Sequence, residues 1–252
     1  MMKSYLSKTV CLGEKYTLGY AIYLMDKSGE IDNIKEPLQT RLLSFIHDVP
    51  LYPTSKPIEN MNIINMIVEI PRFTTEKMEI VTTADNNPIM YDLKDGQIRN
   101  VTYQAKSAEK SGYPFHYGAI PQTWENSLEI DHRTGLLGDD DPLDCFDISL
   151  IPASTGSVRH VKVLGAIAMI DDGMTDWKLV GINTDDPMAN LYDDIDQVPV
   201  AIMDQIIDFL KFYKLPNVTQ FDKKMIWNAE ESMEIVRSLH NEWIRHKNPR
   251  SV

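Results

Sequence analysis

The sequence is poor in cysteine and contains no long apolar run. Its two cysteines, Cys11 and Cys145, form neither a Cys-x-x-Cys pair nor a zinc-type spacing with histidine. This excludes a disulfide-stapled scaffold and favours a reducing compartment. No stretch approaches the length of a membrane span, and residues 1–20 hold no apolar run of signal-peptide length. We therefore expect a cytoplasmic protein, or an organellar one if the chain is cut from a longer precursor.

Basic residues are also scarce, and two common catalytic patterns are missing. The chain has 25 Lys and Arg against 37 Asp and Glu, a formal net charge of −12. This balance argues against nucleic acid and anionic membranes as partners, and an anionic ligand would need metal ions beside it. The sequence has no Gly-x-Ser-x-Gly elbow, and neither cysteine adjoins a histidine, which argues against a covalent nucleophile.

Apolar and β-branched residues predict strands in the first two-thirds of the chain and helices in the last quarter. The expected strands are 20–25, 63–70, 78–82, 147–151, 158–170 and 177–182. Helical spacing covers 202–213, which Pro199 opens, and 233–243. The polar, proline-containing stretch at about 26–60 is expected to be a surface excursion with a short helix near 39–46. The pattern predicts one mainly β domain over residues 1–252, a barrel or strongly curved sheet with helices outside.

The most informative segment is the acidic run at 138–144, which reads Gly-Asp-Asp-Asp-Pro-Leu-Asp and is followed by Asp147. Five carboxylates within nine residues repel one another in a compact fold unless a cation lies among them. Pro142 predicts a rigid turn that enters a strand near Cys145. A solvated acidic loop is the ordinary alternative for such a run.

A second acidic cluster, Asp171, Asp172 and Asp176 around Gly173, follows the long apolar strand. Taken alone it is typical of a hairpin turn. Hard divalent cations such as Mg²⁺ prefer carboxylate oxygens, and several ions close together need carboxylates from separate segments. The two clusters together therefore suggest a multinuclear metal site.

In these residues the chain resembles the soluble family I inorganic pyrophosphatases of the eukaryotic type. The run Asp-Asp-Asp-Pro-Leu-Asp at 139–144 carries the resemblance, and further blocks match in order at 47–52, 68–73, 77–79, 118–125, 173–178 and 213–214. The likeness extends from about Thr17 to Trp243. It implies an OB-like five-stranded β-barrel flanked by helices, mainly β with α, with the site at the barrel mouth and a homodimer as the usual assembly.

The resemblance also implies the ligands of several Mg²⁺ ions, for which Mn²⁺, Zn²⁺ or Co²⁺ are alternatives. Asp139, Asp144 and Asp176 would hold the tighter ion, with Asp144 bridging to a second ion beside Asp141. Asp171 and Asp176 would hold a third ion that arrives with the substrate. Glu69 and Glu79 would act on the ions largely through water.

For the substrate, inorganic pyrophosphate, the resemblance implies charged donors and hydroxyl donors. The charged donors are Lys77, Arg99, Lys178 and Lys214, and the hydroxyl donors are Tyr117 and Tyr213. A water activated between two ions would attack one phosphorus without a covalent intermediate, and Asp141 would take its proton. Taken singly, each Lys or Arg is more often a solvated surface residue, and each Tyr a packing residue.

Three departures from the family pattern stand out. Asp140 occupies a position where eukaryotic members typically have Asn, the loop at 215–220 is short and lacks a lysine, and extra residues occur near 32–43 and 105–109. The changed loops leave the dimer geometry open. Two rival functions also remain open: hydrolysis of short polyphosphate or nucleotides at the same site, and a catalytically silent cation-binding module that acts through partners.

Overall fold

The computed structural model describes residues 8–26, 42–53, 62–101, 103, 111–213 and 225–248. The strands up to the middle of the chain are β1 Lys8–Leu12, β2 Ala21–Met25, β3 Leu42–Leu43, β4 Ile63–Ile70, β5 Met78–Ile80, β6 Ile89–Tyr91, β7 Leu93–Lys94, β8 Gln97–Ile98 and β9 His116–Ala119. The later ones are β10 Ile130–Asp131, β11 Leu136–Leu137, β12 Asp144–Asp147, β13 Val158–Asp171, β14 Met174–Asn183 and β15 Ile226–Asn228. The helices are α1 Val200–Phe212 and α2 Ala229–His246, with short 3₁₀ turns η3 Pro187–Asn190 and η4 Ile195–Gln197.

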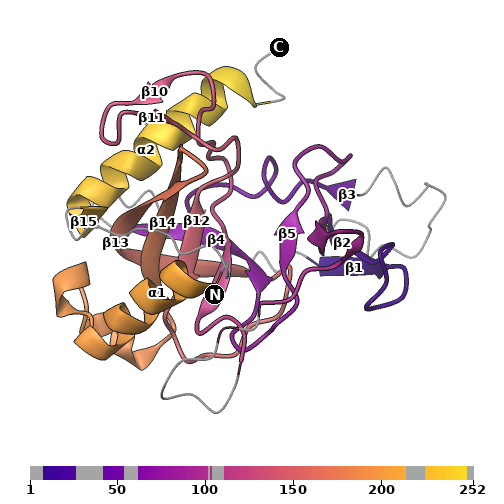
Figure 1. The fold of residues 1–252 in the computed structure, drawn as a ribbon, viewed down its shortest axis with the longest axis horizontal. Helices are drawn as coiled ribbons and strands as arrows, with labels where there is room; N and C mark the ends of the chain where they lie inside the picture. Colours follow the sequence, from indigo (N-terminus) through magenta and orange to yellow (C-terminus); the bar gives the residue numbers. More distant parts are fainter. Residues whose placement is uncertain are drawn as a thin grey trace.

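Five strands close into a ring, which confirms the predicted five-stranded barrel. Their order is β14-β12-β9-β4-β13, and β13 pairs back with β14 to complete the circle. All pairings in the ring are antiparallel except that of β12 with β14, which is parallel. Closure leaves the ring without a free edge. A second sheet, β1-β2-β6-β5 with β3 beside β2, lies at the end of the molecule away from α2 (Figure 1).

Both predicted helices form, and each buries an apolar stripe. The α1 helix places Ile206, Phe209 and Leu210 in one core cluster, where the Phe209 ring meets those of Tyr113 and Phe146. The α2 helix packs on β13 and contributes to the other core cluster. Figure 1 shows α2 running beside the β10–β11 hairpin, with α1 on another side of the barrel. The barrel is therefore flanked by helices, as expected.

The strand predictions hold with one exception, the segment 147–151. The strand there is β12, which begins at Asp144 and ends at Asp147. The buried Asp147 carboxylate accepts hydrogen bonds from the backbone N–H groups of Ser149 and Asn183 at 2.9 and 3.0 Å. These bonds turn the chain out of the sheet directly after Asp147, so the expected strand was wrong from residue 148 onward.

The expected surface helix near 39–46 is also wrong where the structure describes it. Leu42 and Leu43 form β3, and the chain then makes a single turn that the Ser44 hydroxyl closes by accepting from the N–H of Ile46 and His47. Residues 39–41 lie outside the described part. Residues 42–53 belong to the stretch that was predicted to be a surface excursion. They are not a surface segment, because Phe45, Val49 and Leu51 are buried in the core.

Candidate active site

The signature loop and the hairpin turn, distant in sequence, lie side by side. Gly138 forms a parallel bridge with Thr175, and β12 then pairs with β14 so that Asp144 stands opposite Lys178. The hairpin itself is a tight two-residue turn in which Asp172 and Gly173 both have positive φ, as predicted. The bridge therefore brings the acidic loop before β12 against the start of β14, which carries Asp176.

As a result, carboxylates from three segments meet. One carboxylate oxygen each from Glu125, Asp139 and Asp176 lies within 4.8 Å of the others. Asp139 and Asp176 were predicted ligands. Glu125 was not assigned a role from the sequence, although it ends the matching block at 118–125. The one sequence feature that could have indicated Glu125 is that it is the acidic residue at the end of an otherwise uncharged run. Its burial could not be predicted from the sequence.

A cavity of about 220 Å³ opens between β4, β5, β9 and the loop before β12. It brings together six predicted site residues, namely Glu69, Lys77, Glu79, Tyr117, Asp141 and Asp144. Glu69 sits at a register shift between Val68 and Ile70, a bulge that breaks the alternation of β4, and its carboxylate accepts from the N–H of Ile80 at 2.7 Å. The bulge and this bond fix Glu69 between the barrel and the second sheet.

The acidic groups of the site lie close together and are largely removed from water. Burial, together with the charge of Asp176, raises the pKa of Asp139 to about 7. Burial and the charge of Asp144 raise the pKa of Asp141 to about 6. Burial is also the main reason that the pKa values of Glu69 and Glu125 lie well above their usual range. Burial therefore disfavours the ionised form of these carboxyl groups unless a cation lies among them.

The donor set fits a hard divalent cation. Every ligand atom in the cluster is a carboxylate oxygen from a buried or half-buried side chain on a rigid strand or its adjoining loop. A divalent ion among them would offset both the loss of hydration and the mutual repulsion that raise their pKa values. The residues present thus fit a divalent metal site, and the chemistry of the donors alone does not select one ion.

Asp144 accepts hydrogen bonds from two other side chains of the site. The Tyr117 hydroxyl and the Lys178 ammonium both donate to its Oδ2, and Lys178 also contacts Asp176. Burial by itself would lower the pKa of Lys178, but the charges of Asp144 and Asp176 outweigh it and raise the pKa well above its usual value. Lys178 is therefore a permanent cation inside the site.

Two further cations share one carboxylate. Asp92 Oδ2 lies 3.0 Å from Lys77 Nζ and 3.0 Å from Arg99 Nη1, and Lys77 also contacts Glu79 at 2.5 Å. The backbones are tied as well, because the N–H of Lys77 donates to the carbonyl of Arg99 at 2.9 Å. Asp92 was not predicted as a site residue. It lies outside every matching block, so the sequence offered no signal for it.

The remaining predicted residues differ in how well the structure places them. Tyr213 follows α1 and stacks on Phe209, and burial raises its pKa, with Lys178 and Asp171 among the charges that act on it. Asp171 ends β13 opposite Met174 at the hairpin turn. Lys214 lies outside the described residues.

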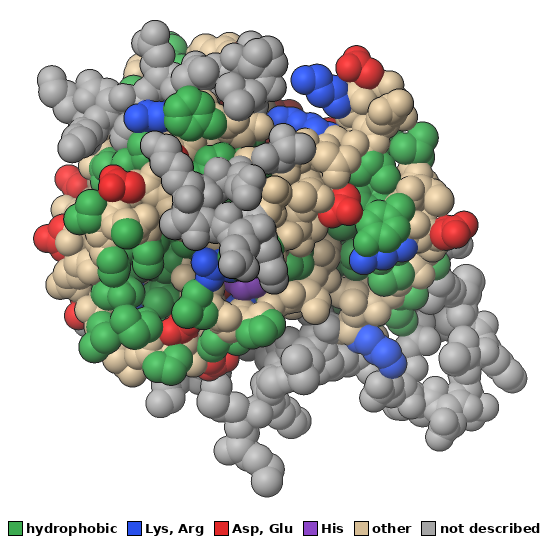
Figure 2. All heavy atoms as spheres, turned by 60° about the horizontal axis from the view of Figure 1, so that its bottom comes forward, with side chains coloured by type: hydrophobic (Ala, Val, Ile, Leu, Met, Phe, Trp, Pro, Cys, Tyr) green, Lys and Arg blue, Asp and Glu red, His purple; other side chains and the backbone are tan. Residues whose placement is uncertain are grey.

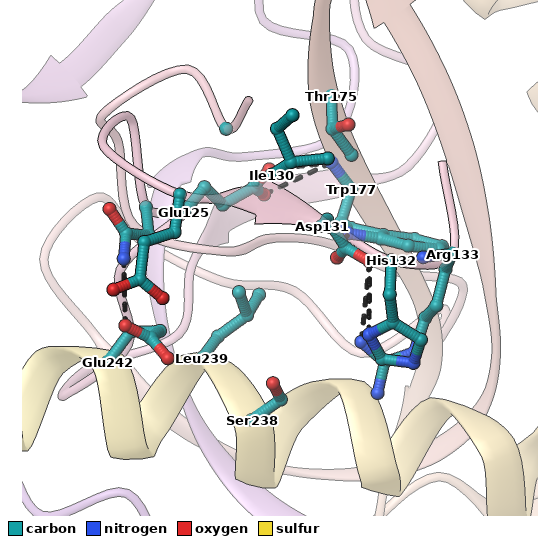
Figure 3. Close-up of a pocket in the computed structure, with 13 residues that line it drawn as sticks. Glu125, Ile130, Asp131, His132, Arg133, Thr175, Trp177, Ser238, Leu239 and Glu242 are labelled. Atoms are coloured by element: carbon teal, nitrogen blue, oxygen red, sulfur yellow. Dashed lines mark hydrogen bonds and ion pairs between the residues drawn. The ribbon is translucent and has the colours of Figure 1, made fainter. Parts of the chain in front are cut away.

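A second cavity, of about 170 Å³, lies behind Glu125 between the β10–β11 hairpin and α2. Figure 3 shows the Glu125 side chain reaching toward the backbone of Trp177, whose N–H donates to it at 3.0 Å, while Ser238, Leu239 and Glu242 rise from α2. On the hairpin side, Asp131 accepts from Trp177 Nε1 at 3.1 Å. Glu125 is thus held from behind by the backbone of the strand that carries Asp176.

The chain is similar to known proteins in sequence and in fold. The inorganic pyrophosphatase family profile matches residues 66–244. Inorganic pyrophosphatase of Drosophila melanogaster is 38% identical over 98% of this chain and 70% of its own length. The solved structure of inorganic pyrophosphatase from Schistosoma japonicum superposes with a TM-score of 0.81 at 35% identity, covering 94% of this chain and 79% of that one.

A structure of N-terminally truncated Trypanosoma cruzi vacuolar soluble pyrophosphatase in complex with PPi is also similar, with a TM-score of 0.80 at 32% identity over 96% of this chain and 93% of that one. The rivals of the pyrophosphatase reading are not favoured by these similarities. The chain belongs to the inorganic pyrophosphatase family.

Proposed function

We propose that this protein hydrolyses inorganic pyrophosphate to two phosphates at the cavity between β4, β5, β9 and the start of β12. The observation that supports this most directly is the meeting of Asp139 and Asp176, from two distant segments, within 4.8 Å. Three buried or half-buried cations border the site. Lys178 contacts both Asp176 and the cavity residue Asp144, while Lys77 and Arg99 share Asp92. Carboxylates that can hold divalent ions, bordered by basic side chains, suit a polyanionic substrate that binds together with metal ions.

Mg²⁺ is the ion we propose, with Mn²⁺, Zn²⁺ and Co²⁺ as substitutes for the same oxygen donors. The residues that would hold the ions are Asp139, Asp141, Asp144, Asp171, Asp176, Glu69 and Glu79. To these we add Glu125, because its carboxylate belongs to the cluster of Asp139 and Asp176. Divalent ions bound there would lower the pKa of a coordinated water and neutralise phosphate oxygens.

The chain's own groups would then carry out binding and proton transfer. Asp141 lines the cavity and its pKa, raised by burial and by Asp144, lies at about 6, close to the working range of a general base. Lys77, Arg99, Lys178 and Lys214 would neutralise charge on the phosphates, and the Tyr117 and Tyr213 hydroxyls would donate hydrogen bonds. This catalysis is positional and electrostatic and needs no covalent intermediate.

Assembly, partners and compartment also remain proposals. We propose a homodimer of single-domain chains, which light scattering after size-exclusion chromatography will test. We propose no nucleic-acid partner, because the net charge is −12 and the described Lys and Arg side chains form no continuous basic patch on the face in Figure 2. In the described part of the chain no helix is long and apolar enough to cross a membrane. The cytoplasm stays our proposal, although one similar structure is of a vacuolar enzyme.

The test is phosphate release from pyrophosphate, tripolyphosphate and ATP, with Mg²⁺ or Zn²⁺ and with a chelator. We expect pyrophosphate to be the preferred substrate with Mg²⁺, and the chelator to abolish release. Equal activity with chelator present would refute the metal role, and preference for tripolyphosphate or ATP would refute the substrate.

The role of Asp141 is tested by Asp141→Asn, which keeps the size of the side chain but removes the base. We expect turnover to fall by about 10²- to 10⁴-fold while the fold is retained. The matched control is Asp85→Asn, the same change at an exposed position. Turnover at the parent rate in Asp141→Asn would show that another group accepts the proton.

A further inference from the structure

Asp140 turns away from the site that its two neighbours form. Its φ is +76°, in the left-handed region, so its side chain points to a different side from those of Asp139 and Asp141. Asp140 Oδ1 accepts from Trp124 Nε1 at 2.8 Å, from Ser127 Oγ at 3.2 Å and from Lys247 Nζ at 3.2 Å. The middle carboxylate of the signature loop therefore anchors the loop.

The anchor connects the loop to the end of α2. Lys247 is the C-terminal cap residue of that helix, and its ammonium also lies 4.4 Å from the centroid of the Trp124 ring. Trp124 is buried, and its backbone N–H donates to the carbonyl of Leu239 in α2 at 3.2 Å. We name Asp140, Trp124 and Lys247 the helix clamp.

The loop that contains Asp140 is also hydrogen-bonded to the segment that carries Glu125. The N–H of Asp140 donates to the carbonyl of Glu125 at 3.1 Å, and the N–H of Glu125 donates to the carbonyl of Asp141 at 2.9 Å. Any movement of Asp140 is therefore transmitted directly to Asp141 and Glu125. Without a cation, the repulsion among the carboxylates of this cluster acts to spread the loop.

We propose that the helix clamp is a positioning device that holds Asp139, Asp141 and Glu125 in their metal-ready arrangement in the ion-free protein. Asp140, Trp124 and Lys247 are not among the proposed metal ligands or the residues that line the cavity, and they act through the loop backbone. The inference rests on the proposed metal site. Because preorganised ligands lose less freedom on binding, the clamp lowers the metal concentration that the site requires. It does not change turnover once the site is filled.

The expected effect is modest, because the Asp140 and Lys247 side chains retain 58% and 40% of their exposure. Water screens an ion pair of this kind, so its loss changes an equilibrium constant by roughly two- to fivefold. Lys247→Met removes the charge and keeps the apolar stem. Lys247→Arg keeps both the charge and the ring contact. Lys94→Met removes the same charge from the exposed β7–β8 hairpin and is the matched control.

Two measurements that do not depend on turnover test the clamp. After a chelator has removed metal from the protein, calorimetric titration with Mn²⁺ gives the metal dissociation constant. Hydrogen exchange reports on the backbone amides of residues 138–141. We expect Lys247→Met to raise the dissociation constant roughly two- to fivefold and to speed exchange in that loop. Lys247→Arg and Lys94→Met should match the parent, and all variants should reach the parent turnover at saturating Mg²⁺.

The outcomes separate the two proposals. Unchanged Mn²⁺ affinity in Lys247→Met, with binding intact in the parent, would overturn the clamp and leave the proposed function standing. An equal loss of affinity in Lys94→Met would also overturn it, since general charge would then be the cause. Failure of the parent itself to bind Mn²⁺ would overturn the metal site and the clamp together.

Discussion

Single side chains in this site are held in place by groups that do no chemistry. Asp92 illustrates this, because one of its oxygens accepts from both Lys77 and Arg99 at 3.0 Å. Burial acts to raise the pKa of Asp92, but the charges and hydrogen bonds of Lys77 and Arg99 outweigh it and lower the pKa. Asp92 therefore stays ionised and keeps two cations, which would otherwise repel each other, side by side.

The prediction at this scale concerns Asp92→Asn. The amide oxygen can still accept a hydrogen bond but carries no negative charge, so it no longer offsets the repulsion between Lys77 and Arg99. The two cations should therefore separate and bind phosphate less well. We expect the KM for pyrophosphate to rise roughly tenfold, the order expected for loss of a charge-assisted hydrogen bond, with a smaller effect on kcat.

Steady-state kinetics at saturating Mg²⁺ will check this expectation. Asp95→Asn is the control, because it makes the same exchange at an exposed turn position three residues away whose positive φ Asn also accepts. A KM equal to that of the parent in Asp92→Asn would show that Lys77 and Arg99 are positioned without it.

Among the elements, the β13–β14 hairpin decides where two of the acidic ligands lie. Its strands pair from Val161 opposite Asn183 to Asp171 opposite Met174, and its turn consists of Asp172 and Gly173 alone. Both turn residues have positive φ, 47° and 83°, which matches the right-handed twist of the flanking strands. A longer turn would shift the register that places Asp176 beside Asp139.

We predict that Gly173→Ala destabilises the protein through backbone conformation alone. A Cβ at residue 173 would meet no atom within 4 Å, so the cost is that of the left-handed conformation, roughly 1–2 kcal/mol. Urea unfolding will measure the change in the free energy of unfolding. Gly19→Ala is the control, since residue 19 also has open space but no positive φ. Equal losses of unfolding free energy in Gly173→Ala and Gly19→Ala would show that the left-handed conformation of residue 173 is not the cause.

On the scale of the whole molecule, α2 is joined to a segment from the other end of the chain. Trp243 Nε1 donates to His47 Nδ1 at 3.0 Å, and the two rings stack with their centroids 5.9 Å apart. Because Nδ1 must accept, His47 is neutral in the folded protein. Burial is the main cause that lowers its pKa below the usual value of 6.5, and Asp48 opposes this only in part.

This contact predicts a pH dependence of stability. Above about pH 6.5 His47 is neutral in both the folded and unfolded states, so its contribution is fully present. As the pH falls below that value, the unfolded chain takes up a proton that the folded protein resists, and stability is lost.

The parent should therefore lose more unfolding free energy between pH 7.5 and 5 than His47→Gln, whose amide oxygen can accept from Trp243 without titrating. Urea unfolding of both proteins at several pH values gives this difference. The difference between the two pH profiles isolates the contribution of His47 from that of other titrating groups. One of these is His116, whose pKa is also lowered, mainly by burial. Parallel pH profiles would contradict the assignment.

Much of the fold followed from local pattern. Runs of apolar and β-branched residues predicted β4, β13 and β14, because these strands are buried along most of their length. Helical spacing predicted both helices, because burial of one helix face imposes its period on the sequence. The segment at 44–51 was missed, since its prolines and polar residues masked Phe45 and Leu51, whose burial depends on partners far along the chain. The strand expected after Asp147 failed because long-range hydrogen bonds to that carboxylate, not propensity, end β12.

The sequence by itself determined the family and the identity of the carboxylates and cations, because these are properties of residues and their order. Only the tertiary structure decided which of them meet. The parallel bridge between Gly138 and Thr175 places Asp139 beside Asp176. The Trp177 N–H holds Glu125 in the same cluster, and Asp92 joins Lys77 to Arg99. Such encounters depend on how strands from separate parts of the chain come into register, and no local pattern encodes that.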